Sequence, residues 1–192
     1  MTAVPSPAAD PGVELLQRAL DYTRGALATV RAEHLCDPTP CDLWRLGDLL
    51  AHMEDALDAF AEGAEGAIDL HSAAPAPVEE RLETIRTKAC GLLGAWASAP
   101  APVVLVGGQA VPVDTIARLA AVEITVHGWD VHQTTGSAEP VPAALAEELL
   151  PTAFTLGLDQ HGEFGPPVAV PSGAGPARRM LALLGRADPR PD

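Results

Sequence analysis

Apolar side chains recur at helical spacing in several long segments of the chain. Four segments show this pattern most clearly, over residues 11–30, 46–64, 77–97 and 114–135. The first opens with Asp10-Pro11, a capping carboxylate followed by a proline that suits the first helical position, and Pro38 and Pro40 mark its end. The last stops at Gly136, a residue typical of helix C-termini. The pattern predicts four amphipathic helices, each with one face to bury.

Shorter elements follow the third and fourth helices. The segment PVVLVGGQAVPV, residues 102–113, places two β-rich runs around Gly107-Gly108 and predicts a small hairpin. A weaker fifth helix begins after Pro142, and we expect Pro151 to kink or divide it. A Pro/Gly-rich stretch predicts irregular structure over residues 162–176, and ARRMLALLG after it predicts one or two final helical turns.

The predicted fold class is all-α. Short connections between amphipathic helices favour antiparallel packing, which predicts a four-helix bundle with a β-hairpin before the fourth helix and a C-terminal extension. A length of 192 residues suits a single domain. We expect its core helices within residues 11–160 and an irregular extension over residues 161–192.

The charge balance argues against polyanionic partners. With 12 basic and 26 acidic residues the net charge is −14, so we expect neither nucleic acid nor an anionic membrane surface as a partner. Three cysteines at no metal-type spacing, and an N-terminus without a basic, apolar leader, predict a cytoplasmic protein. We expect a monomer or a homodimer that acts on a small molecule.

The fourth predicted helix carries candidate chemistry on its apolar face. Glu123, His127 and Asp130 lie on the same stripe as the apolar residues, whereas His132 points the opposite way. A buried carboxylate needs a compensating partner. A divalent metal between Glu123 and His127 would supply it, because the i, i+4 spacing directs both side chains to one side. A hydrogen-bonded Glu–His pair that fixes helix packing would fit the same spacing.

A metal site needs a third ligand from another helix, and His52 is the best candidate. It flanks the apolar stripe of the second helix beside Ala56, Ala59 and Gly63, whose small side chains would leave room for a cleft. An exposed surface histidine is the alternative. Asp130 is a candidate catalytic residue that could orient a ligand or hold an imidazole N–H, although a carboxylate there could also serve only the helix.

Two segments resemble a known family. TPCDLWRLGDLLAHM, residues 39–53, and EITVHGWDVHQTTG, residues 123–136, are similar to the mycothiol-dependent maleylpyruvate isomerase branch of the DinB-like superfamily. The tail, with FGPPVAVP and RRMLALLGRADP, resembles short single-domain members of that branch. The resemblance implies a four-helix bundle that binds a divalent metal, often zinc, through a His from the second helix and a later Glu/His pair. The matching positions are His52, Glu123 and His127.

The resemblance also implies a chemistry. Three ligands leave an open position on the metal, where family members activate the thiol mycothiol for isomerisation or S-transfer. We therefore expect a metal-dependent thiol transferase or isomerase acting on an electrophilic small molecule. The alternatives are a thiol-independent metalloenzyme, with Lewis-acid, hydrolytic or non-haem iron chemistry, and a non-catalytic small-molecule-binding protein.

Two positions depart from the family pattern. Arg45 stands where many relatives place a Thr or Ser that caps the metal-bearing helix, which predicts a frayed or differently capped helix start here. Many relatives have a Leu-Ala-Arg run where this chain has Val131-His132-Gln133. If that Arg helps to bind an anionic thiol or substrate, this chain lacks the binding group. Trp44, Trp129 and Cys41 are interpreted as packing residues.

Overall fold

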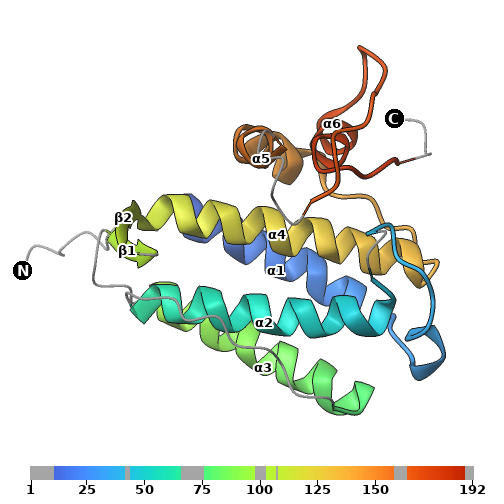
Figure 1. Cartoon of the computed structure of the whole chain (residues 1–192), viewed down its shortest axis with the longest axis horizontal. Coiled ribbons are helices and arrows are strands. Elements are labelled where there is room, and N and C mark those ends of the chain that lie inside the picture. Colours follow the sequence, from blue (N-terminus) through green and yellow to red (C-terminus); the bar gives the residue numbers. More distant parts are fainter. Residues whose placement is uncertain are drawn as a thin grey trace, which may run out of the picture.

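The computed structural model describes residues 11–41, 44–65, 76–97, 103–106, 108–157 and 164–188. Its elements, in chain order, are α1 (Pro11–Leu27), the 3-10 helix η1 (Ala32–His34), α2 (Leu46–Glu65), α3 (Val78–Ala97), β1 (Val103–Val106), β2 (Gln109–Pro112), α4 (Val113–Thr134), α5 (Ala143–Gly157) and α6 (Pro176–Leu183). The predicted mostly helical fold is confirmed. Helices α1 to α4 form one bundle, and α5 and α6 lie together outside it against the α4 side (Figure 1).

The helix directions differ from the prediction of antiparallel neighbours. Arg81 near the start of α3 pairs with Glu54 in the first half of α2, and Trp96 Nε1 donates to the Phe60 carbonyl farther along both, so these two helices are parallel. About a dozen residues separate α2 from α3, enough for an extended chain to return along a helix of about 30 Å. With a connection of this length, α3 can begin at the same end of the bundle as α2, so the two helices need not be antiparallel.

Helices α1 and α4 are also parallel, and they approach each other closely. Thr23 Oγ1 donates a 2.8 Å hydrogen bond to the Ile124 carbonyl. A Cβ at Gly128 would overlap the same hydroxyl, so the residue after His127 must lack a side chain for the two helices to lie this close. The contact fixes the position of α4 along α1 at the level of the candidate site.

The smaller elements mostly follow the predictions. Strands β1 and β2 form an antiparallel hairpin in which Gly108 has a φ of +82°, while Gly107 lies outside the described residues. Helix α5 runs through Pro151 and is not divided by it. Helix α1 ends at Leu27, well before Pro38 and Pro40, the residues predicted to end it. The predicted capping role of Asp10 falls outside the described residues.

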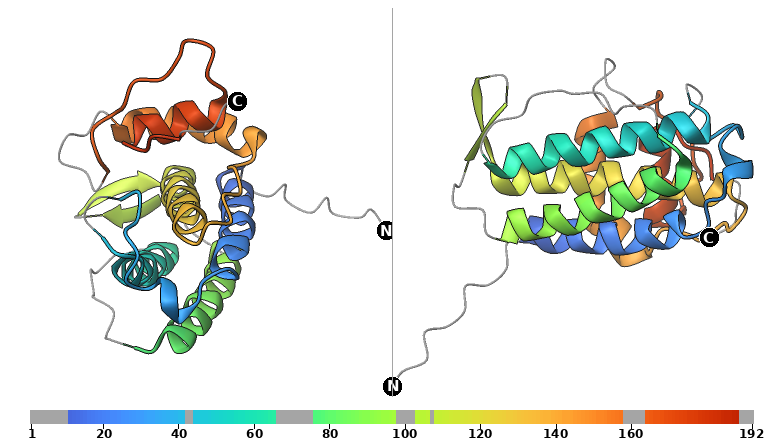
Figure 2. Two further views of the ribbon diagram at one scale, coloured as in Figure 1. Left: turned by 90° about the vertical axis from the view of Figure 1, so that its right-hand side faces the viewer. Right: turned by 90° about the horizontal axis from the view of Figure 1, so that it is seen from below.

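Figure 2 shows the bundle in cross-section, with the pair α5 and α6 layered over α4. The core runs through all four bundle helices, and its largest fully buried side chains include Leu16, Leu50, Ile85 and Trp129. Within the described residues, no helix is long and apolar enough to cross a membrane.

Candidate metal centre

Helix α4 carries the candidate ligands on a face that the bundle buries. From Ala120 to His132 every residue of this helix is buried, because α1 and α2 cover one side and α5 the other. Glu123, His127 and Asp130 therefore sit in an apolar setting, as the helical stripe predicts. His132 lies elsewhere on the helix, where its ring contacts Tyr22 and its Nδ1 meets the Ser137 hydroxyl.

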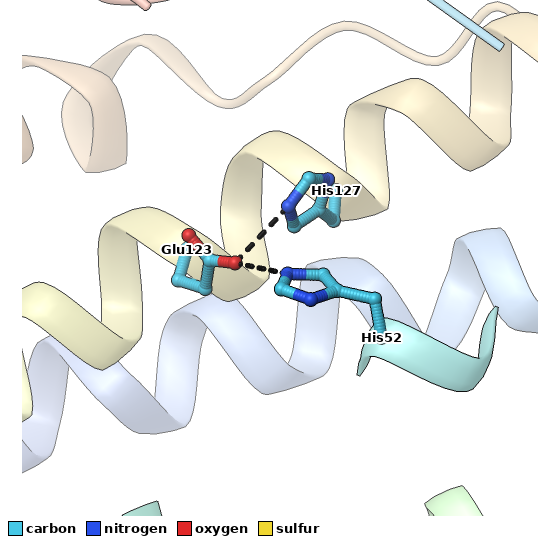
Figure 3. Close-up of side chains that lie close together, drawn as sticks. All are labelled: His52, Glu123 and His127. Atoms are coloured by element: carbon cyan, nitrogen blue, oxygen red, sulfur yellow. Dashed lines mark hydrogen bonds and ion pairs between the residues drawn. The ribbon is translucent and has the colours of Figure 1, made fainter. Parts of the chain in front are cut away.

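His52 on α2 reaches across to the two α4 ligands (Figure 3). Its Nε2 lies 2.7 Å from Glu123 Oε1, and His127 Nε2 lies 3.1 Å from the same oxygen. One ligand atom from each residue falls within 4.8 Å of the others. His52 is half-buried, so the alternative of an exposed surface histidine is wrong. The structure brings the three predicted ligands together.

Asp130 contacts the ring nitrogen of His127 that does not face Glu123. Its Oδ2 accepts a 3.0 Å hydrogen bond from His127 Nδ1, the contact that the imidazole-holding interpretation requires. The same oxygen accepts a 2.9 Å hydrogen bond from Arg186 Nη2. Both Asp130 and Arg186 are almost fully buried, and the guanidinium lies over the ring of Phe164, which stacks on His127. A direct role of Asp130 in catalysis stays a prediction.

Arg186 is the contact that sequence reasoning missed. A buried Asp130 in an apolar stripe signals that a cationic partner must exist, but it does not say which arginine. The residues lie 56 positions apart, and the contact depends on how the segment after α6 folds back on α4.

Charges within the cluster stabilise one another. Burial opposes ionisation of Glu123, but the charge of His127 and the hydrogen bond from His52 outweigh it, so the pKa of Glu123 lies well below its usual range. Burial alone would lower the pKa of His127, whereas the charge of Glu123 and the hydrogen bond with Asp130 raise it to about 9. The site therefore attracts a positive charge, whether a proton or a cation.

The residues fit a metal ion. Asp130 holds a proton on His127 Nδ1, so Nε2 is the ring nitrogen that faces Glu123 and that could bind a metal once its proton is lost. Among the described residues, His127 Nε2 has no hydrogen-bond partner, since its approach to Glu123 is poorly aligned. At that distance Glu123 and Nε2 need a positive charge between them, which the second proton of His127 supplies in the metal-free protein and a metal ion could supply in its place. A zinc ion bound at about 2.1 Å to each ligand would need ligand separations of about 3.4 Å, close to the spacing present.

Neighbouring aromatic and cysteine side chains pack as predicted, with one addition. Trp129 and Cys41 are buried. Trp44 is half-buried and its ring centroid lies 4.4 Å from that of His52, so it packs against a ligand itself. The start of α2 has the different cap expected: the Arg45 backbone N–H donates to Asp48 Oδ2 at 3.1 Å.

A cavity of about 320 Å³ lies between the four bundle helices and reaches the cluster. Glu123 and His127 form part of its lining. Ala56, one of the small residues predicted to leave room beside His52, also lines it. A small molecule inside the cavity would therefore lie beside the two α4 ligands.

Comparison with solved structures agrees with the bundle. The crystal structure of the mycothiol-dependent maleylpyruvate isomerase matches with a TM-score of 0.54 and 16% sequence identity, covering 82% of this chain and 75% of that one. A histidine-to-alanine mutant of the same isomerase matches with the same TM-score and 14% identity. At these identities the likeness concerns the fold.

Sequence comparison extends the match. Two proteins from Mycobacterium tuberculosis strains, MT0763 and Rv0738, both described as uncharacterized, are 29% identical over 184 residues, which is 88% of this chain and 94% of each relative. The model of the mycothiol maleylpyruvate isomerase N-terminal domain family matches residues 16–132, the segment that holds most of α1 and α4, all of α2 and α3, and all three candidate ligands. The chain belongs to the mycothiol maleylpyruvate isomerase N-terminal domain family.

Proposed function

We propose that this protein is a metal-dependent thiol transferase or isomerase that binds a divalent metal, zinc in our assignment, through His52, Glu123 and His127. The observation that carries the proposal is the convergence of these three side chains beside a cavity that Glu123 and His127 line, with His127 Nε2 directed at Glu123 and otherwise unpartnered among the described residues. Two imidazoles and one carboxylate form the ligand set of catalytic zinc sites, which keep a position open for a substrate.

The chain's own residues would prepare the site for a thiol. Asp130 fixes the tautomer of His127 and thereby the ligand nitrogen, and Arg186 holds Asp130 in place. The apolar helices around the cavity exclude water from the reacting groups. A metal bound there would lower the pKa of a coordinated thiol, so that the thiolate could attack an electrophilic small molecule at neutral pH.

Mycothiol is the thiol that the family name suggests. The proposal predicts about one zinc per chain in the purified protein and calorimetrically detectable mycothiol binding to it. His52→Ala should lose both, while His34→Ala, the same change in a histidine outside the cluster, should keep both. Zinc and mycothiol binding that survive in His52→Ala would contradict the proposal.

A thiol-independent metalloenzyme is the second candidate. Val131-His132-Gln133 stands where the family resemblance places an arginine, so a binding group for an anionic cosubstrate is lacking at that position. A protein that holds zinc through His52 but binds no mycothiol would favour this candidate. Lewis-acid or hydrolytic turnover without added thiol would then be the activity to measure.

A further inference from the structure

The cavity that reaches the candidate ligands opens between α1 and α3. Its inner wall contains Glu123 and His127 from α4. Its lining also includes Asp21 and Arg24 of α1 and Arg86 of α3, whose side chains are exposed and therefore lie at the outer rim. Helix α1 packs less extensively against α3 than against α4, which is consistent with an opening between α1 and α3.

Between its rim and the ligands the cavity is lined mainly by apolar side chains. They come from all four bundle helices and include Leu20, Leu27, Met53, Leu57, Ile85 and Ile124. Such a wall offers few polar partners to a bound molecule, so the middle part of a ligand must be apolar to gain from leaving water. Any charged group of the ligand would have to stay at one of the two ends.

The rim carries two guanidinium groups on facing helices. Arg24 lies 3.5 Å from Asp21, and Arg86 lies 3.6 Å from Glu83. All four side chains are exposed, so these ion pairs are weak and a ligand carboxylate can replace them. The rim is therefore not positive overall, but an anion that displaces these exposed carboxylates would contact two guanidinium groups.

We propose that this cavity binds the acceptor substrate, and that the substrate is an apolar small molecule with an anionic end. Arg24 and Arg86 hold the carboxylate or a similar anion at the rim, and the apolar body extends inward. The reactive end then lies beside Glu123 and His127. This last step rests on the proposed function, whereas the preference for an anionic apolar ligand does not.

The test compares ligands that differ only in charge. Hexanoate and octanoate would be titrated against hexanol and octanol into the purified protein, with binding followed by amide chemical-shift changes at cavity residues such as Ala56 and Ala89. The carboxylates should bind about tenfold more tightly at low salt, since two exposed charges each contribute modestly. The preference should shrink at high salt.

Variants assign the preference to the rim. In Arg24→Gln/Arg86→Gln the carboxylate and the alcohol should bind within about twofold of each other. Arg31→Gln, an exposed arginine outside the cavity, should retain the full preference. Asp21→Asn, which removes the rim carboxylate beside Arg24, should increase it. These substitutions change exposed side chains and leave the core intact.

Two results would overturn the proposal: alcohols that bind as tightly as the carboxylates, or a carboxylate preference that persists in the double variant and so arises elsewhere, for example at the metal. Neither ligand carries a thiol. Loss of mycothiol binding with an intact carboxylate preference would therefore count against the proposed function and not against this site.

Discussion

Two carboxylates of α2 and α4 have side chains equally shielded from water, yet their partners differ in kind. Glu54 and Glu123 are each 12% exposed. Glu54 pairs with Arg81 at 2.6 Å and with Lys88 at 3.0 Å, two groups that carry a positive charge at any physiological pH. Within the part of the chain that the structure describes, the ion pairs of Glu123 are with two imidazoles, those of His52 and His127, whose charge depends on a proton.

The difference separates a structural ion pair from a site that can exchange its cation. The chain itself neutralises Glu54, so no further ligand is needed there. Glu123 is neutralised only while His127 keeps a proton, and a metal ion can take the place of that proton. Burial of a carboxylate is thus uninformative by itself, and the permanence of its partner's charge is what distinguishes the two environments.

The largest effect expected from this comparison concerns metal binding. Glu123→Gln removes a charged ligand and should lower zinc affinity at least about 100-fold. Glu54→Gln is the matched control, because it removes a carboxylate of equal exposure from α2 and should leave zinc affinity unchanged. Competition titration with a chromogenic zinc chelator measures both. Equal affinities in the two variants would place the metal elsewhere.

For the stability of the chelator-treated protein, Glu54→Gln should have the larger effect of the two variants. Glu54→Gln leaves the buried Arg81 with a charge it cannot release, and should lower the free energy of unfolding by about 2 kcal/mol. Glu123→Gln should cost less, because His127 can lose its proton once the carboxylate is gone. Urea unfolding of both variants with excess chelator checks the ranking. A larger loss in Glu123→Gln would show that the cluster supports the fold without metal.

The sequence predicted one of these two environments and not the other. Glu123 and His127 share an apolar stripe at i, i+4 spacing, a local pattern that helix geometry alone reveals. His52 needed the family resemblance, because its helical position fits a surface residue as well. The partners of Glu54 come from a helix that is parallel to α2, contrary to the antiparallel expectation, so their register was not predictable.

Elsewhere in the chain, too, features set by local signals were predictable, and features set by tertiary folding were not. The start of α2 at Leu46 and the stop of α4 before Gly136 follow from local signals and were predicted within two residues. Helix α1 ends earlier than its apolar rhythm suggests, because η1 takes over before the prolines. The contact of Arg186 with Asp130 depends on tertiary folding of the C-terminal segment, and periodicity carries no information on it.

A pH titration should separate the two carboxylates further. The folded pKa of His127, about 9, lies above its ordinary value of 6.5, so its stabilising contribution is complete below pH 6.5 and is lost as the pH rises through 9. Chelator-treated protein should therefore lose about 2 kcal/mol between pH 6.5 and 8.5. His127→Gln should show no such fall in urea unfolding. The cost of Glu54→Gln should be the same at both pH values, and a pH-dependent cost would contradict the assignment of permanent charges to its partners.

The smallest expected effect comes from Lys88→Met. Lys88 is only partly buried and shares Glu54 with Arg81, so its removal leaves that carboxylate paired. Asp58, its other partner, is exposed enough to be solvated by water. The free energy of unfolding should fall by about 0.5 kcal/mol, with zinc affinity unchanged. A loss as large as that of Glu54→Gln would mean that Arg81 alone does not neutralise the carboxylate. The two permanent charges at Glu54 would then be needed together, which would bring this ion pair closer to the three-residue cluster of the candidate metal centre, where Glu123 faces two imidazoles.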